Sequence, residues 1–281
     1  MSLSKNLSKI SYRAITLLVV ILFAGVFLSI FYSNTYIDSH LFSFNFLFGD
    51  VQNAGRKGGV GPVLFSTLIV VFIAIIPTVI ISIISGHFLY GLQRKNPLLY
   101  KVLDVFTYIL AAVPSVVMGL FGNVLFVHKL GLGFSLLSGG ITLSFMILPL
   151  TIKVVERSFA NIDIDIKTSA ASLGLSERNT FFKVLLPCAK SGIISAIIIG
   201  VGRALSETAA LLFTSGYVTR SPESVLDSGR VLSVHIFELV MNVPGGDLMA
   251  KKSVTILFVF VLLFNYFALK IMKGKSHESS F

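Results

Sequence analysis

Long apolar stretches separated by short polar ones dominate the hydrophobic pattern of this 281-residue chain. A transmembrane helix needs about 20 mainly apolar residues. The connections between the apolar stretches are turn-rich or charged, as in GLQRKN and HKLGLGFS. The pattern predicts an all-α integral membrane protein with six membrane-spanning helices: Ile15–Tyr32, Leu64–Ile84, Val105–Val127, Leu136–Ile152, Gly192–Thr214 and Val254–Lys270.

The first apolar stretch also has to be compared with a secretory signal peptide. Lys5, Lys9 and Arg13 precede it, as in a signal peptide, but no clear small-residue cleavage site follows it. The stretch is long enough to span a bilayer, so we expect a retained helix.

Composition supports a chain that is dissolved in lipid. It is 54% hydrophobic and only 13% charged, with a mean hydropathy of +0.88. Such values differ from those of an ordinary soluble domain. The single cysteine, Cys188, excludes an intramolecular disulfide framework and a four-cysteine metal site. The five histidines show no metal-ligand spacing, and we expect no bound metal.

The net charge of +10 would suggest nucleic acid as a partner of a soluble protein. With the N-terminus in the cytoplasm, 15 lysines and arginines fall on the cytoplasmic side and seven on the outer side, while Arg203 lies within the fifth span. The positive-inside rule then places both termini in the cytoplasm. The basic balance therefore reports topology, and no nucleic-acid partner is expected.

The cytoplasmic connection 154–191 is too polar to span and too patterned for an idle linker. KTSAASLG predicts a short helix of small residues that ends at Gly174. Ser176 then caps a second helix, which carries Phe181 and Phe182 until Pro187 ends it. These features favour a docking element for a cytoplasmic partner. An amphipathic loop lying on the lipid surface is the alternative.

Two charged residues stand out in VGRALSETAALLF, which reads as the continuation of the fifth helix. Arg203 and Glu207 are one turn apart there, on one helix face. A charge at mid-helix costs about 2.5–3.5 kcal/mol on insertion scales, so both should face protein or water. Arg203 presents a planar fork of donors that suits an oxyanion in a translocation path. A structural ion pair that clamps the helix to a neighbour is the other interpretation.

The cytoplasmic segment resembles the EAA motif of ATP-binding-cassette importer permeases, E-A-A-x-x-x-G followed by I-x-L-P. Here Thr168-Ser169-Ala170, Gly174 and Val184-Leu185-Leu186-Pro187 occupy the corresponding positions, with departures at Thr168, Ser169 and Val184. In that family the loop forms coupling helices in a cleft of the ATPase subunit. The resemblance implies that the following residues couple to an ATPase: Thr168, Ala170, Gly174, Phe181, Phe182, Leu186 and Pro187.

A narrower resemblance comes from AAVPSVVMGLFG (111–122) and GRALSETAALLF (202–213). They are similar to the GVPSIVYGLFG and RALGETAPLL signatures of phosphate-importer permeases of the PstA type, with Ser206 for glycine and Ala210 for proline. GGVGPVLFSTLIV and SLLSGGITLSFMILPLTIKVVE extend the likeness, which covers about residues 58–272. It implies that the substrate pathway is lined by Arg203, Glu207, Thr208, Pro114 and Ser115.

The resemblance also implies the architecture of a type I importer permease in a bacterial inner membrane. Residues 1–57 would hold the first helix and an outer loop, 58–272 a five-helix core with the coupling loop 154–191, and 273–281 a cytoplasmic tail. The expected partners are a sister permease, cytoplasmic ATP-binding subunits and an extracytoplasmic phosphate-binding protein. Arg220 and Arg230 of the outer loop would meet that protein or the substrate, or remain solvated.

The chain carries no Walker lysine motif, so we expect a transport subunit and not an enzyme. ATP and magnesium would be used by the partner ATPase, and this chain would bind no cofactor. Three alternatives stay open. The first is a permease for another oxyanion, such as molybdate or sulfate. A membrane-embedded enzyme would need paired aspartates or a Ser/His arrangement within the spans, and none is visible. A passive channel or sensor leaves the docking loop unexplained.

Overall fold

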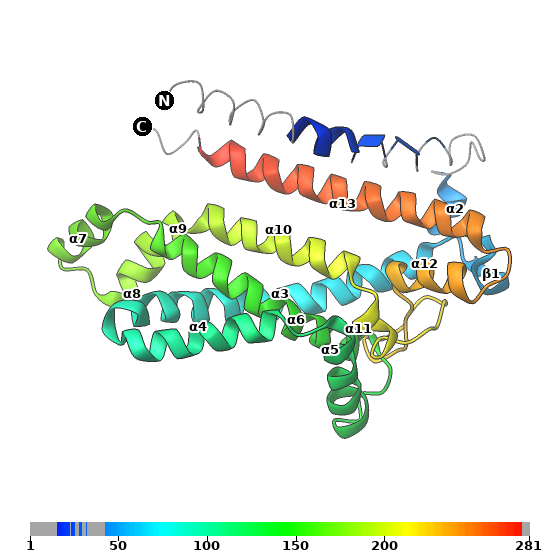
Figure 1. Ribbon diagram of the computed structural model, residues 1–281, viewed down its shortest axis with the longest axis horizontal. Helices are drawn as coiled ribbons and strands as arrows, with labels where there is room; N and C mark the ends of the chain where they lie inside the picture. The colour runs from blue at the N-terminus through cyan, green and yellow to red at the C-terminus, as the bar shows by residue number, and fades with distance from the viewer. Residues whose placement is uncertain (1–15, 23, 26–27, 30–31, 33–42, 277–281) are drawn as a thin grey trace.

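A computed structural model describes residues 16–22, 24–25, 28–29, 32 and 43–276 of the chain. Its long helices lie side by side along the longest axis of the molecule (Figure 1). They are α3 (Gly61–Lys95), α4 (Pro97–Ala111), α6 (Leu136–Ala160), α10 (Lys190–Ser206) and α13 (Asp247–Ser276). The shorter elements are α2 (Phe44–Phe48), β1 (Val51–Gln52), η1 (Asn53–Gly55), β2 (Lys57–Gly58), α5 (Ser115–Gly122), η2 (Asn123–Lys129), α7 (Ile164–Ser172), α8 (Glu177–Thr180), η3 (Phe181–Leu185), α9 (Leu186–Cys188), α11 (Ala209–Leu212) and α12 (Leu232–Met241).

Within residues 43–276, three helices are long and apolar enough to cross a membrane: α3, α6 and α13. Two bent pairs raise the number to as many as five, if each pair is one span. In one pair α4 meets α5 and η2 at 92°, and in the other α8–α9 meets α10 at 64°. The first predicted span, 15–32, lies partly outside the described residues, as does the end of the predicted tail.

The α3–α6 pair forms the centre of the bundle, and small and hydroxylated residues line its interface. Ser82 and Thr151 share a hydrogen bond of 2.6 Å, and Thr78 and Ser144 share one of 2.9 Å. Gly140 lies so close to α3 that a Cβ there would be 2.4 Å from a methyl carbon of Ile73. Close backbone approach and interhelical hydrogen bonds hold helices together in lipid, where apolar burial between helices supplies little driving force.

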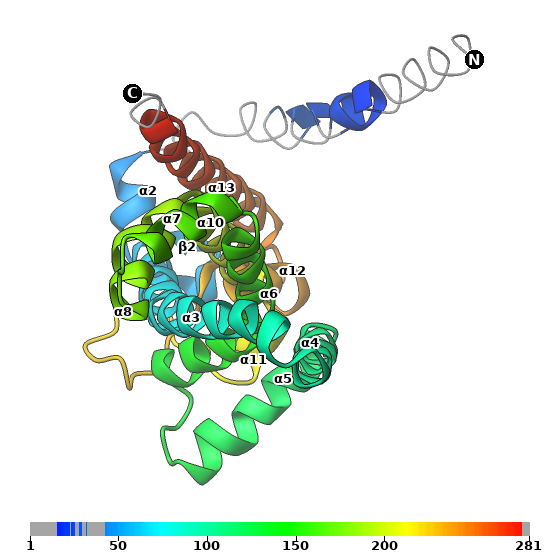
Figure 2. The same cartoon turned by 90° about the vertical axis from the view of Figure 1, so that its left-hand side faces the viewer.

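A buried apolar cluster joins this centre to α10, α11 and the start of α12. Figure 2, which looks roughly along the bundle, shows these helices gathered around α3 and α6, with α4 and α5 to one side. The cluster consists of Val70, Ala74, Leu136, Leu143, Met146, Ile147, Ala204, Ala210, Leu211, Val231 and Val234.

Two of the predicted spans are not single straight helices. The span 105–127 breaks between Ala111 and Ser115, since Pro114 lacks an N–H and disfavours a helical conformation of Val113. The span 192–214 begins earlier, at Lys190, and breaks after Ser206. Pro77, by contrast, lies inside α3 without ending it.

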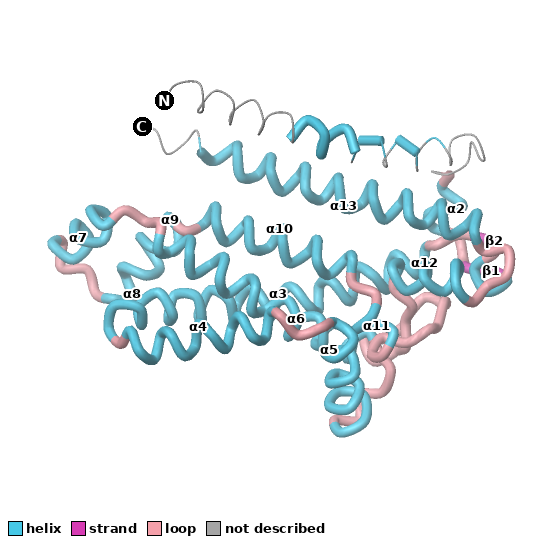
Figure 3. Tube along the Cα trace, viewed as in Figure 1, coloured by secondary structure: helices cyan, strands magenta, loops and turns pink. Residues whose placement is uncertain are grey.

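Figure 3 shows loops at both ends of the bundle, and further loops beside α5 and α11. We call the end with α7, α8 and α9 the α7–α9 end. The opposite end, with the antiparallel β1–β2 hairpin, α12 and the loop before it, is called the hairpin end. The apolar segment LSVHIFELVM forms the short helix α12.

Candidate functional site

The break after α10 is built from hydrogen bonds to Glu207. This residue is extended, with φ −79° and ψ 128°, so it ends the helix. Its Oε1 accepts the N–H of Ala210 in α11, at 3.3 Å. Its carbonyl oxygen accepts the hydroxyl of Ser233 in α12, at 2.6 Å. The Glu207 N–H still donates to Ala204 of α10 at 3.4 Å, but its carbonyl is satisfied from α12 and not by a further helical turn, so the helix ends at this residue.

Arg203 lies in the last turn of α10 and is half-buried. The prediction that Arg203 and Glu207 share one face of a continuous helix is wrong, because Glu207 is outside the helix. Among the described residues no ion pair involves Arg203, so the predicted structural clamp is absent there. Its Nε is buried without a hydrogen-bond partner. A half-buried guanidinium with unused donors is suited to an anion that enters from outside the chain.

The second break, at Pro114, is brought close to the first through the short helices that follow each of them. Gly119 of α5 packs on α11, where an added Cβ would be 2.7 Å from the Cα of Ala210. Asn123 donates its side-chain N–H to the carbonyl of Phe213, at 2.7 Å. Asn123 and Phe213 are 90 residues apart in the sequence, so this hydrogen bond makes neighbours of the segments 111–122 and 202–213. The contact runs through Gly119 and Ala210, whereas Ser115 and Arg203 share no hydrogen bond.

The loop at the α7–α9 end confirms the predicted caps. Gly174 has φ +67°, and it donates its N–H to Ala171 while Leu175 donates to Ala170. This is the Schellman arrangement, which needs a glycine-like conformation after the helix. The hydroxyl of Ser176 accepts the N–H of Asn179, as expected of an N-cap.

Two of the predicted coupling residues are turned toward the interior of the chain. Phe181 packs inside the chain, with its ring centroid 4.4 Å from that of His87, and Ala170 is buried. Pro187 does not end the second helix, which continues to Cys188. Thr168, Gly174, Phe182 and Pro187 are exposed, and Leu186 is half-buried. A shallow pocket of about 370 Å³ lies between α7 and η3. It is lined by Asp165, Ile166, Ser169, Ala170, Leu173, Leu175 and Val184.

Sequence reasoning missed a buried charge cluster between α4 and α6. Lys153 donates to the carboxylates of Asp104 and Glu156, and the Tyr100 hydroxyl donates to Glu156 at 2.8 Å. The Lys153 side chain is only 11% exposed. A lysine, three residues before a glutamate at the end of a span, could have signalled the cluster, but its partner Asp104 is 49 residues away. The cluster ties α4 to the central pair.

Replacing Lys153 with methionine should leave two carboxylates without their cation. Breaking a buried ion pair by removing one partner costs about 3–5 kcal/mol. We therefore expect a clear fall in the melting temperature of the purified protein in detergent. Lys95→Met is the matched control, since Lys95 pairs with Glu177 at 3.9 Å with side chains 79% and 98% exposed. Equal melting temperatures for the two variants would show that the cluster does not stabilise the fold.

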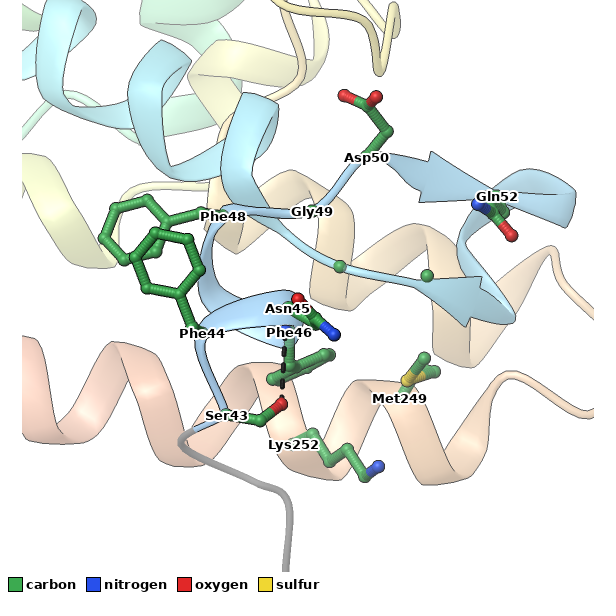
Figure 4. Close-up of a pocket in the computed structure, with 12 residues that line it drawn as sticks. Ser43, Phe44, Asn45, Phe46, Phe48, Gly49, Asp50, Gln52, Met249 and Lys252 are labelled. Atoms are coloured by element: carbon green, nitrogen blue, oxygen red, sulfur yellow. Dashed lines mark hydrogen bonds between the residues drawn. The ribbon is translucent and has the colours of Figure 1, made fainter.

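A separate pocket of about 560 Å³ opens at the hairpin end. Figure 4 shows Phe44 and Phe48 stacked at one side of it and Lys252 and Met249 of α13 at the other. The Ser43 hydroxyl accepts the Phe46 N–H at 3.3 Å, which fixes the turn of α2. None of the predicted pathway residues lines this pocket. No group of three or more His, Cys, Asp or Glu in the part of the chain that the structure describes is placed to hold a metal ion.

The fold is that of a type I importer permease. It matches a chain of the MetNI methionine ABC transporter, solved in inward-facing conformations, with a TM-score of 0.64. The match covers 76% of this chain and 95% of that one at 17% sequence identity. The similarity extends to the arrangement of the apolar helices, two of which are bent in this chain.

The chain belongs to the family of binding-protein-dependent transport system inner membrane components, whose sequence pattern matches residues 78–273. It is therefore an inner-membrane permease component of an ABC transporter and not an enzyme. Members of such systems work with an ATPase and a binding protein.

Three relatives illustrate the spread of similarity. The probable ABC transporter permease protein YqgI of Bacillus subtilis is 29% identical, over 79% of this chain and 81% of its own length. A phosphate transport system permease protein PstA of Xylella fastidiosa is 28% identical, over 74% and 72%. A PstA homolog of Mycoplasma pneumoniae is 31% identical over 78% of this chain, which spans only 34% of that longer protein.

Proposed function

We propose that this chain is one transmembrane permease subunit of an ATP-driven importer of inorganic phosphate, and that it forms half of the translocation path. The observation that carries the proposal is Arg203, half-buried beside a helix break with an unpartnered Nε. Irregular backbone at membrane depth is tolerated where it is buried in protein or lines a water-filled cavity. The relatives named as phosphate permeases support phosphate as the anion.

Glu207 would take part through its carboxylate. One oxygen accepts the Ala210 N–H, which leaves lone pairs on the other oxygen for a proton donor. Hydrogen phosphate carries such a P–OH group, whereas sulfate at neutral pH has none. Arg203 would neutralise the charge of the anion, and Glu207 would favour the protonated oxyanion. Thr208, Pro114 and Ser115, at the two breaks, would complete this chain's share of the path.

The α7–α9 end would face the cytoplasm and the hairpin end the outside, with both termini cytoplasmic. Residues 58–272 would form the core, preceded by a first helix and outer loop in 1–57. A sister permease would complete the path, and an extracytoplasmic phosphate-binding protein would deliver the anion. ATP and magnesium bound by two cytoplasmic ATPase subunits would move the coupling loop 154–191 and, through it, α6 and α10.

The decisive experiment is uptake of radioactive phosphate by the complete complex in a host without its own phosphate importers. We expect ATP-dependent uptake that excess arsenate suppresses and excess sulfate or molybdate does not. Suppression by sulfate or molybdate, with weak phosphate uptake, would identify another oxyanion as the cargo. Uptake that persists without ATP would identify a passive channel.

A further inference from the structure

The loop between α11 and α12 is held firmly in place at the hairpin end. Backbone N–H groups of Leu136 and Leu137 donate to the carbonyls of Asp227 and Val225, at 3.0 and 2.9 Å. The N–H groups of Glu223 and Ser224 donate to the Asp227 carboxylate, which holds the pKa of this carboxyl below its ordinary value. The loop therefore closes over the start of α6 in a defined conformation.

Arg230 lies at the end of this loop with a partly buried guanidinium. Its backbone N–H donates to Val218 at 2.8 Å, and its Nε donates to the carbonyl of Tyr217 at 3.1 Å. Its Nη1 is buried and has no hydrogen-bond partner. In the part of the chain that the structure describes, no carboxylate lies within ion-pair distance of it. Burial lowers the pKa of Arg230, and the attraction of Glu238 offsets this effect only in part.

The nearest titratable neighbour along α12 does not supply that charge. His235 is buried, and its Nδ1 also lacks a partner. Burial and the positive charge of Arg230 lower the pKa of His235 to about 4, so its imidazole is neutral at neutral pH. Glu238 acts on Arg230 only at longer range, without an ion pair. A partly buried guanidinium with an unsatisfied donor costs free energy, which a bound anion would offset.

Arg230 is also linked to the break that carries Arg203. Ser233, three residues after Arg230, donates to the carbonyl of Glu207 at 2.6 Å. Val231, adjacent to Arg230, packs in the same apolar cluster as Ala204, which is adjacent to Arg203. The segment that presents Arg230 thus sits directly on the broken helix.

We propose that Arg230 is a second anion-binding residue, which receives the oxyanion at the hairpin end before it reaches Arg203. The inference rests on the proposed function, because it takes the anion path at Arg203 as given. The free Nη1 and the remaining donors of the fork would bind the anion as charge-assisted hydrogen bonds. The bond from Nε to the Tyr217 carbonyl would keep the fork oriented while it waits.

The test uses the complete complex in proteoliposomes, with the phosphate-loaded binding protein, and measures phosphate transported per ATP hydrolysed. Arg230→Gln is expected to lower this ratio about tenfold, the loss that corresponds to one charged hydrogen bond. ATP hydrolysis should continue, because the binding protein still triggers it. Arg230→Lys should retain most of the ratio. Arg56→Gln, which changes an exposed arginine beside the β1–β2 hairpin, is the control and should change nothing.

Two outcomes would overturn the inference. The first is an unchanged ratio in Arg230→Gln. The second is a parallel loss of uptake and ATP hydrolysis together with a lower melting temperature, which would mark Arg230 as structural. Failure of the proposed function is distinguishable, since the wild-type complex would then not transport phosphate. If Arg203→Gln abolishes uptake and Arg230→Gln does not affect it, the function stands and this inference alone falls.

Discussion

Replacing Arg203 with glutamine is expected to lower phosphate uptake by about 100-fold or more, because two charge-assisted hydrogen bonds to the anion are lost. Arg203→Lys should give an intermediate rate, since an ammonium keeps the charge but not the planar fork. Initial rates of radioactive phosphate uptake in cells that express the complete complex provide the measurement.

Stability separates this pathway role from a structural one. The Nε of Arg203 is buried without a partner, and no ion pair to it exists among the described residues, so glutamine should cost little stability. The melting temperature of Arg203→Gln should match that of Arg157→Gln, which changes an exposed arginine in the last turn of α6. Normal uptake by Arg203→Gln would remove this residue from the mechanism.

The sequence predicted the helix caps and the membrane spans, because both depend on residues that are close together in the chain. The glycine at 174 requires a left-handed conformation after α7, and Ser176 offers its hydroxyl to the next helix, so both caps follow from neighbouring residues. Each of the five apolar stretches predicted after residue 43 overlaps a candidate span, if each bent pair counts as one, because about 20 apolar residues are needed to cross a bilayer.

The breaks in the helices depend on contacts that a linear pattern does not contain. The end of α10 depends on Ser233, which is 26 residues from Glu207 and satisfies its carbonyl. Without that partner, ALSETAALLF reads as continuous helix. The hydrophobic pattern places Lys153 just after a predicted span, among the lysines and arginines of the cytoplasmic side. In the structure it pairs with Asp104 and Glu156 inside the bundle. Contacts between elements far apart in the sequence thus decide where α10 ends and where Lys153 lies.

The surface of the α7–α9 end yields the second large expected effect. Leu173 lies at the end of α7 beside Gly174 and is 77% exposed. It lines the shallow pocket between α7 and η3. An apolar side chain so exposed next to a pocket is suited to a partner's surface. Leu173→Asp should abolish copurification of the ATPase subunits and ATP-driven uptake, since a carboxylate buried at an interface without a cation is strongly unfavourable.

The matched control is Leu98→Asp, which changes a leucine that is 76% exposed near the start of α4. Both substitutions add a carboxylate at an exposed position, so both proteins should fold and insert alike. Only the variant in α7 should lose the ATPase, because only α7 belongs to the proposed coupling loop. If Leu173→Asp retained the ATPase and transported normally, the loop would lie on the lipid surface, and force would have to reach α6 and α10 by another contact.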